Sequence, residues 1–144
     1  MLHRALLFAT YSIEEYTRNP ELLDITDDIT DFYSGEIKEI RESLSKIIAL
    51  LKTTDLKNDD TAYVKDYKSV IAKMSDELSS TSPKESAEAT YIKQSLALLE
   101  AIYSLAENSV KYSKNTLTKD ISESIIKNTA SYINRLQTLQ KSIK

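Results

Sequence analysis

The sequence predicts an all-α fold, an antiparallel four-helix bundle of long helices with an additional short N-terminal helix. Hydrophobic residues make up 41% of the 144 residues and charged residues 28%, enough apolar material for one packed domain over 1–144. One glycine and two prolines supply little of the turn chemistry that a β-rich fold needs. Apolar residues also recur at helical spacing along most of the chain.

The first helix is short, and a polar segment separates it from the second. Apolar positions predict a helix over about 2–17, with Tyr16 as the last residue of its apolar stripe. Asn19 is a good capping residue, and Pro20 suits the first helical position, where a missing N–H costs nothing. Glu21 complements the positive end of the helix dipole. These residues mark the start of the second helix.

The second helix is expected to be the longest. Its apolar stripe keeps a helical phase from Leu22 to Leu51, which predicts a helix over about 20–52. Gly35 lies inside this stretch, and glycine in a helix interior costs about 1 kcal/mol. A break at residues 33–37 is therefore the alternative. The unbroken stripe favours a helix that continues through Gly35.

The remaining three helices follow polar connections. Apolar spacing after the segment 52–60 predicts a third helix over about 61–79. Ser82, Pro83 and Glu85 form a capping box, which predicts that a fourth helix begins at residue 83. This helix should extend to about residue 113 and carries two apolar stripes, as expected for a helix with several neighbours. The last helix is predicted over about 118–143.

Four aspartates within eight positions form an acidic stripe near the start of the second helix. Asp24, Asp27, Asp28 and Asp31 fall within one sector of about 100° beside the apolar stripe. A solvated helix face explains the pattern without any function. The string from Asp27 to Asp31 also matches the DDxxD motif of isoprenyl diphosphate synthases, which binds magnesium and diphosphate. No second acidic motif accompanies it, so no metal and no cofactor are expected.

Other arrangements of catalytic residues are incomplete. Glu36 and Glu39 match one half of a magnesium-binding ExxE pair, but its companion motif is missing, and exposed glutamates paired with nearby cations are the simpler interpretation. His3 is the only histidine, and the chain has no cysteine and no glycine-rich phosphate loop. The sequence therefore predicts a protein that is not an enzyme.

Nine tyrosines and no tryptophan are an unusual aromatic content. Tyrosine often packs at the edge of a core with its hydroxyl near solvent, and it is also enriched at protein interfaces. Both interpretations remain open for the tyrosines on or near apolar stripes, which are Tyr63, Tyr67, Tyr91, Tyr103 and Tyr132.

The net charge of −3 conceals a gradient along the chain. Residues 1–60 carry a net −6, residues 61–108 a net −2 and residues 109–144 a net +5. Opposite charges on neighbouring helices can offset each other. If the charged faces diverge instead, the acidic face suits a partner with a basic groove. The candidate partner-binding residues are Asp24, Asp27, Asp28, Asp31, Glu36, Glu39, Lys141 and Lys144.

The whole chain resembles the small helical-bundle proteins of crenarchaeal viruses. The resemblance rests on a cysteine-free composition rich in Ile, Lys, Ser, Thr and Tyr, on a four-helix bundle of this length, and on the basic end of the chain. This group includes the RNA polymerase inhibitor of a two-tailed virus and its virion-protein paralogue. No motif aligns individual residues, so no contact residue is carried over.

The resemblance implies two functions of different classes. The first is inhibition of host RNA polymerase by occupying its positively charged DNA-binding channel, in the host cytoplasm. The alternative is a virion protein that assembles with itself as a homo-oligomer. The overall acidity argues against sequence-specific nucleic acid as a partner. No apolar run is long enough to cross a membrane, so no membrane partner is expected.

Overall fold

The described part of the chain consists of five helices and contains no strand. The computed structural model describes the backbone of residues 2–51, 61–80, 82 and 85–143, and their side chains except those of 43, 44, 46–51 and 61. The helices are α1 (Leu2–Glu14), α2 (Pro20–Leu51), α3 (Thr61–Ser79), α4 (Ala87–Tyr112) and α5 (Thr116–Gln140). The prediction of an all-α fold is confirmed.

Helix α2 continues through Gly35, as the unbroken apolar stripe predicts. Gly35 does not have a positive φ angle. A Cβ atom built on it would have no neighbouring heavy atom within 4 Å beyond its chain neighbours and the backbone of its own helix. The glycine is therefore required neither by the backbone conformation nor by close packing. The predicted end at residue 52 lies outside the described residues.

Helix α1 is shorter than predicted because the chain turns after Glu14. The main-chain N–H groups of Tyr16 and Thr17 both donate to the carbonyl of Ile13, at 3.0 and 2.9 Å, which closes the helix. The hydroxyl of Thr17 is buried, donates to the Glu88 side chain of α4 and accepts from the Asn19 N–H at 3.1 Å. A tertiary contact to α4 therefore fixes this turn.

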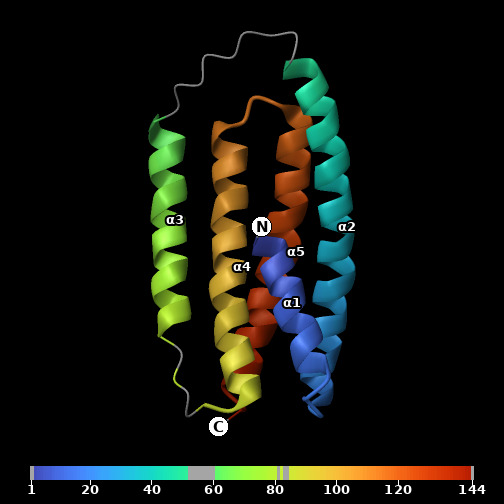
Figure 1. The fold of residues 1–144 in the computed structure, drawn as a ribbon, viewed down its shortest axis with the longest axis vertical. Helices are drawn as coiled ribbons and strands as arrows, with labels where there is room; N and C mark the ends of the chain where they lie inside the picture. Colours follow the sequence, from blue (N-terminus) through green and yellow to red (C-terminus); the bar gives the residue numbers. More distant parts are fainter. Residues whose placement is uncertain (1, 52–60, 81, 83–84, 144) are drawn as a thin grey trace.

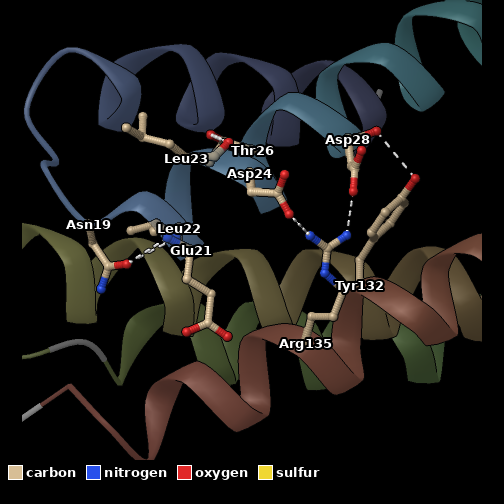
Figure 2. A network of polar contacts seen from close by, with 9 residues as sticks. All are labelled: Asn19, Glu21, Leu22, Leu23, Asp24, Thr26, Asp28, Tyr132 and Arg135. Atoms are coloured by element: carbon tan, nitrogen blue, oxygen red, sulfur yellow. Dashed lines mark hydrogen bonds and ion pairs between the residues drawn. The ribbon is translucent and has the colours of Figure 1, made fainter.

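The predicted start of α2 is correct. The Asn19 Oδ1 atom accepts from the N–H groups of Glu21 and Leu22 at 3.0 and 3.1 Å, as seen on the left of Figure 2. Pro20 is the first residue of the helix. The local sequence determines this boundary because all its capping partners lie within three residues.

The predicted start of α4 at residue 83 is wrong. Ser86 caps the helix, with φ −64° and ψ 158°, and its side chain accepts from the N–H of Ala89 at 3.1 Å. Ser82 lies in a preceding turn, where its carbonyl accepts from the N–H of Glu85 at 3.1 Å. The Glu85 side chain pairs with Lys93 instead of completing a capping box.

Helix α5 also begins and ends earlier than predicted. Asn115 caps it, because its Oδ1 accepts from the N–H of Thr118 at 3.1 Å. The helix therefore begins at Thr116 and not at residue 118. It ends at Gln140, and the main-chain N–H of Lys141 bonds back to the carbonyls of Thr138 and Leu139.

Helix α4 is the centre of the packing. It contacts α1, α3 and α5, and α2 completes the assembly by packing on α1 and α5. Within the described residues, α3 packs closely against α4 and no other helix, as its position at one side of Figure 1 shows. The side chains that are fully buried in the core are contributed by α1, α2, α4 and α5, and include Leu6, Leu22, Ile25, Ile29, Tyr33, Ile92, Leu99, Leu136 and Leu139.

Buried hydroxyl pairs join the core helices. The Tyr33 hydroxyl of α2 lies 2.6 Å from the Thr129 hydroxyl of α5. The Tyr91 hydroxyl of α4 lies 3.0 Å from the Thr10 hydroxyl of α1. Because Thr10 donates its proton to the Leu6 carbonyl, Tyr91 is the donor to Thr10. Each pair satisfies polar atoms that would otherwise be costly inside the core.

The Gly35→Ala variant should be more stable than the wild type by about 0.5–1 kcal/mol. Alanine restricts the unfolded chain and is the better helix former, and the site has room for its methyl group. The free energy of unfolding measured in urea tests this expectation. A less stable variant would mean that the helix is locally distorted at this residue.

Removing one member of the Tyr33–Thr129 pair should cost about 1–3 kcal/mol, because the remaining hydroxyl loses its partner inside the core. Tyr33→Phe and Thr129→Val are the single variants, and the double variant should lose less than their sum. Unfolding free energies of all four proteins give the coupling. Additive losses would contradict a direct bond between the two side chains.

Candidate partner-binding face

Arg135 of α5 holds two of the four aspartates of the acidic stripe. In Figure 2 its guanidinium lies between Asp24 and Asp28, which are one helical turn apart on α2. The Nη2 atom is 2.8 Å from Asp24 Oδ2, and Nη1 contacts Asp28 Oδ2. The Tyr132 hydroxyl donates to the main-chain carbonyl of Asp28 at 3.2 Å. One arginine thus bridges two successive turns of α2.

These ion pairs join oppositely charged segments of the sequence within one molecule. The side chains of Asp24 and Asp28 remain 77% and 53% exposed, so each pair contributes only about 0–1 kcal/mol to stability. For Asp24 and Asp28, charge compensation between neighbouring helices is the correct interpretation.

Asp27 and Asp31 form the other half of the stripe and face outward. Both side chains are exposed, and neither makes an ion pair within the described part of the chain. They are four residues apart, where two like charges on a helix repel by about 0.2–0.5 kcal/mol. A cationic partner would relieve this repulsion. The two aspartates are therefore the part of the stripe that is available for binding.

Glu36 is buried, so its assignment as a partner-binding residue is wrong. Its side chain is 6% exposed, Oε1 accepts from the Ser124 hydroxyl at 3.4 Å, and Oε2 has no hydrogen-bond partner. Burial raises the pKa of this carboxyl group, and the nearby charge of Glu39 raises it further. Glu36 follows the buried residues Ile29 and Tyr33 at helical spacing, so it continues the core face of α2.

The other predicted residues do not complete a single patch. Glu39 is exposed on α2, and Lys141 is exposed directly after the end of α5. Lys144 lies outside the described residues. The available surface is therefore centred on Asp27 and Asp31, with Glu39 two turns further along the helix.

The described residues contain no cluster of three or more histidine, cysteine, aspartate or glutamate side chains that could hold a metal ion. His3 packs against the Tyr33 ring at a centroid distance of 5.0 Å, and burial lowers its pKa to about 4. The imidazole is therefore neutral at pH 7. A hollow between α3 and α4, lined partly by Met74 and Ala101, measures about 30 Å³ and accommodates about one or two water molecules.

The tyrosines divide between the two interpretations. Tyr91 and Tyr132 are buried, whereas Tyr63 and Tyr67 are 36% and 43% exposed on α3. Tyr103 is half-buried. Tyrosines near the apolar stripes thus serve both the core and the surface.

The most exposed large apolar side chains in the described residues are Phe8, Tyr11 and Tyr16. Tyr16 was predicted to be part of the apolar stripe, but α1 ends before it and its side chain is 74% exposed. Phe8 and Tyr11 lie on the face of α1 opposite the buried Leu6 and Thr10. Their phase relative to the apolar stripe was the signal that could have identified this surface from the sequence.

Comparison with known proteins finds no matching family model, and neither a curated protein nor a solved structure is significantly similar to the chain. Among the described helices, none combines the length and the apolar character required to cross a lipid bilayer.

The Glu36→Gln variant should be more stable than the wild type at pH 7, by about 1–2 kcal/mol, because a buried carboxylate with one unpaired oxygen is replaced by a neutral amide. In the unfolded chain the pKa of a glutamate is about 4.3. Below this pH the carboxyl group is mostly protonated in both the folded and the unfolded state, so it does not destabilise the fold. The difference between the variants should therefore vanish at pH 4 and grow as the pH rises.

Unfolding free energies measured from pH 4 to neutral pH, with pH steps of about one unit, check this dependence. Glu42→Gln is the matched control, since Glu42 is exposed on the same helix. Parallel pH profiles for wild type and Glu36→Gln would show that the carboxyl group is not buried as described.

Proposed function

We propose that the chain is a non-enzymatic binding protein that inhibits host RNA polymerase by occupying its positively charged DNA-binding channel. The observation that supports this proposal is the exposed Asp27 and Asp31 pair, which no cation of the described part of the chain neutralises. A carboxylate pair on a regular helix is a suitable complement to a groove that normally binds phosphates. The resemblance to viral helical-bundle proteins supports the choice of the polymerase.

The proposed architecture is an antiparallel four-helix bundle of α2, α3, α4 and α5, with α1 as an additional helix. In Figure 1, successive long helices run in alternating directions along the long axis of the molecule. Helix α2 has 32 residues and is therefore about 48 Å long at 1.5 Å per residue. Apart from the buried Glu36, a rod of this length presents acidic residues such as Asp27, Asp31 and Glu39 to the solvent, which suits insertion into an elongated channel.

Arg135 divides the four aspartates of the acidic stripe into two pairs with different proposed roles. It neutralises part of the charge of Asp24 and Asp28 and fixes their side chains against α5. Asp27 and Asp31 are exposed and make no ion pair within the described part of the chain. In the proposed complex, these two residues attract the basic channel wall during the approach, because exposed charges act at long range.

A second function, self-assembly as a virion protein, is favoured by a different observation. The exposed aromatic residues Phe8 and Tyr11 lie on α1 and Tyr16 lies just after it, and such residues are enriched in protein interfaces. Concentration-dependent association of the purified chain would support this alternative.

Transcription by purified host polymerase tests the first function. The double variant Asp27→Asn/Asp31→Asn should inhibit less than the wild type at low salt, with association slowed about tenfold, and its inhibition should depend less on salt. The matched control Asp24→Asn/Asp28→Asn removes the same formal charge but only from residues that Arg135 already holds. This control variant should lose less of its inhibition than Asp27→Asn/Asp31→Asn.

Three outcomes would contradict parts of this proposal. A wild-type protein without effect on transcription would exclude the polymerase as the target. Equal inhibition by the wild type and both double variants would show that the acidic stripe is only a solvated face. Equal losses in the two double variants would show that net charge matters and the outward position of Asp27 and Asp31 does not.

A further inference from the structure

The outer face of α1 has a symmetric arrangement of side chains. Arg4, Phe8 and Tyr11 on α1 and Glu15, the first residue after the helix, follow one another at intervals of four, three and four residues. The N–H of Thr17 donates to the carbonyl of Ile13 at 2.9 Å, so the chain still follows a helical turn at Glu15. At 100° per residue these four residues lie within a sector of about 60°. All four are exposed, Phe8 by 76% and Tyr11 by 51%. In Figure 1, α1 lies between α4 and α2, in front of α5.

The side chains on this face are complementary to those on the same face of a second copy that runs in the opposite direction. Its centre lies between residues 9 and 10, with an aromatic residue on each side and opposite charges at the two ends. When two copies of α1 lie antiparallel about a two-fold axis at this centre, Phe8 of one copy faces Tyr11 of the other. Arg4 then faces Glu15, and both contacts occur twice. Within the described residues, neither Arg4 nor Glu15 makes an ion pair in its own chain.

We propose that this face, defined by Arg4, Phe8, Tyr11 and Glu15, is a two-fold docking surface for a second copy of this chain. Charge complementarity selects the occupant and the orientation. A parallel arrangement would place Arg4 against Arg4 and Glu15 against Glu15, and like charges in contact are unfavourable. The aromatic pair at the centre supplies the apolar contact that interface cores require.

The exposed residues of α3 do not have the same property. Tyr63, Val64 and Tyr67 form an apolar patch, but Lys68 is the exposed charge next to Val64, and the nearest carboxylate, Asp66, is held by Lys111 and Tyr112. The patch therefore lacks the unpaired opposite charges that make the face of α1 complementary to itself. The patch on α3 is therefore a suitable control surface for experiments on α1.

The docking surface is formed without any rearrangement of the fold. The buried residues of α1, among them Leu6, Thr10 and Ile13, face the core.

A helix of 13 residues is only about 20 Å long, so the contact is smaller than the roughly 1,200–2,000 Å² of a standard interface. The dimer should therefore be reversible. It does not depend on the acidic stripe of α2 or on the proposed function in transcription.

Sedimentation of the full chain, over concentrations from about 1 μM to about 1 mM, should show a monomer–dimer equilibrium. Phe8→Ser should raise the dissociation constant about tenfold or more, since it removes two central aromatic contacts at once. Val64→Ser on α3 is the matched control and should leave the constant unchanged. A monomer throughout this range, or equal association of the wild type and Phe8→Ser, would overturn the proposal.

Charge reversal tests the two-fold arrangement. Arg4→Glu and Glu15→Arg should each weaken the dimer about tenfold, because each creates two contacts between like charges. The double variant restores opposite charges and should dimerise like the wild type. An equimolar mixture of the two single variants should form a heterodimer for the same reason. Failure of both rescues would overturn the antiparallel pairing.

The absence of cysteine allows a second, independent measurement. Proteins carrying Arg4→Cys and Glu15→Cys should form a disulfide with each other faster than either forms one with itself. Lys68→Cys on α3 replaces Glu15→Cys in the control mixture and should react more slowly with Arg4→Cys. Circular dichroism spectra serve to check that all variants are folded. Equal rates in the two mixtures would contradict the proposed contact between the ends of α1.

Discussion

The hydrogen bond between Tyr33 of α2 and Thr129 of α5 constrains the rotation of the longest helix. Both hydroxyl groups are buried and 2.6 Å apart, so α2 cannot rotate or slide without leaving polar atoms unpaired in the core. The Tyr33 ring also contacts His3 of α1 and lies near the ring of Tyr132 of α5. One side chain therefore links the orientations of three helices.

The rotation of α2 determines what each acidic residue can do. With Tyr33 pointing into the core, Glu36 follows it into the interior, while Asp24 and Asp28 meet Arg135 on α5. Asp27 and Asp31 are left on the solvent side. Residues of the same chemical type, within four turns of one helix, thus become a buried acid, two bridged carboxylates and two free charges. Position on the helix, and not residue type, decides which of them can bind a partner.

Two surfaces of different character result, and they lie on successive helices. In the proposed complex, the exposed Asp27 and Asp31 of α2 would act through charge, which is long-ranged and weakened by salt. In the proposed dimer, the outer face of α1 would combine aromatic contacts with paired charges at its ends, which is a short-range and orientation-dependent combination. Helix α3 contributes little to either surface. Its described side chains are only partly buried and contact α4 through residues such as Met74, together with the ion pair of Lys73 and Glu100 at 3.1 Å.

The helical class, the continuity of α2 through Gly35 and the cap at Asn19 can all be predicted from local sequence, because periodicity and capping act over a few neighbouring residues. The sequence also identified the acidic stripe. The end of α1 at Glu14 depends on the contact of Thr17 with Glu88, far away in the chain, which no local pattern shows. Glu36 shares the helical spacing of Ile29 and Tyr33, and packing against α5, where Ser124 contacts it, is what buries the side chain. The division of the aspartates likewise depends on Arg135, more than a hundred residues away. Local pattern specifies where a side chain lies on its helix, but only packing specifies what faces it.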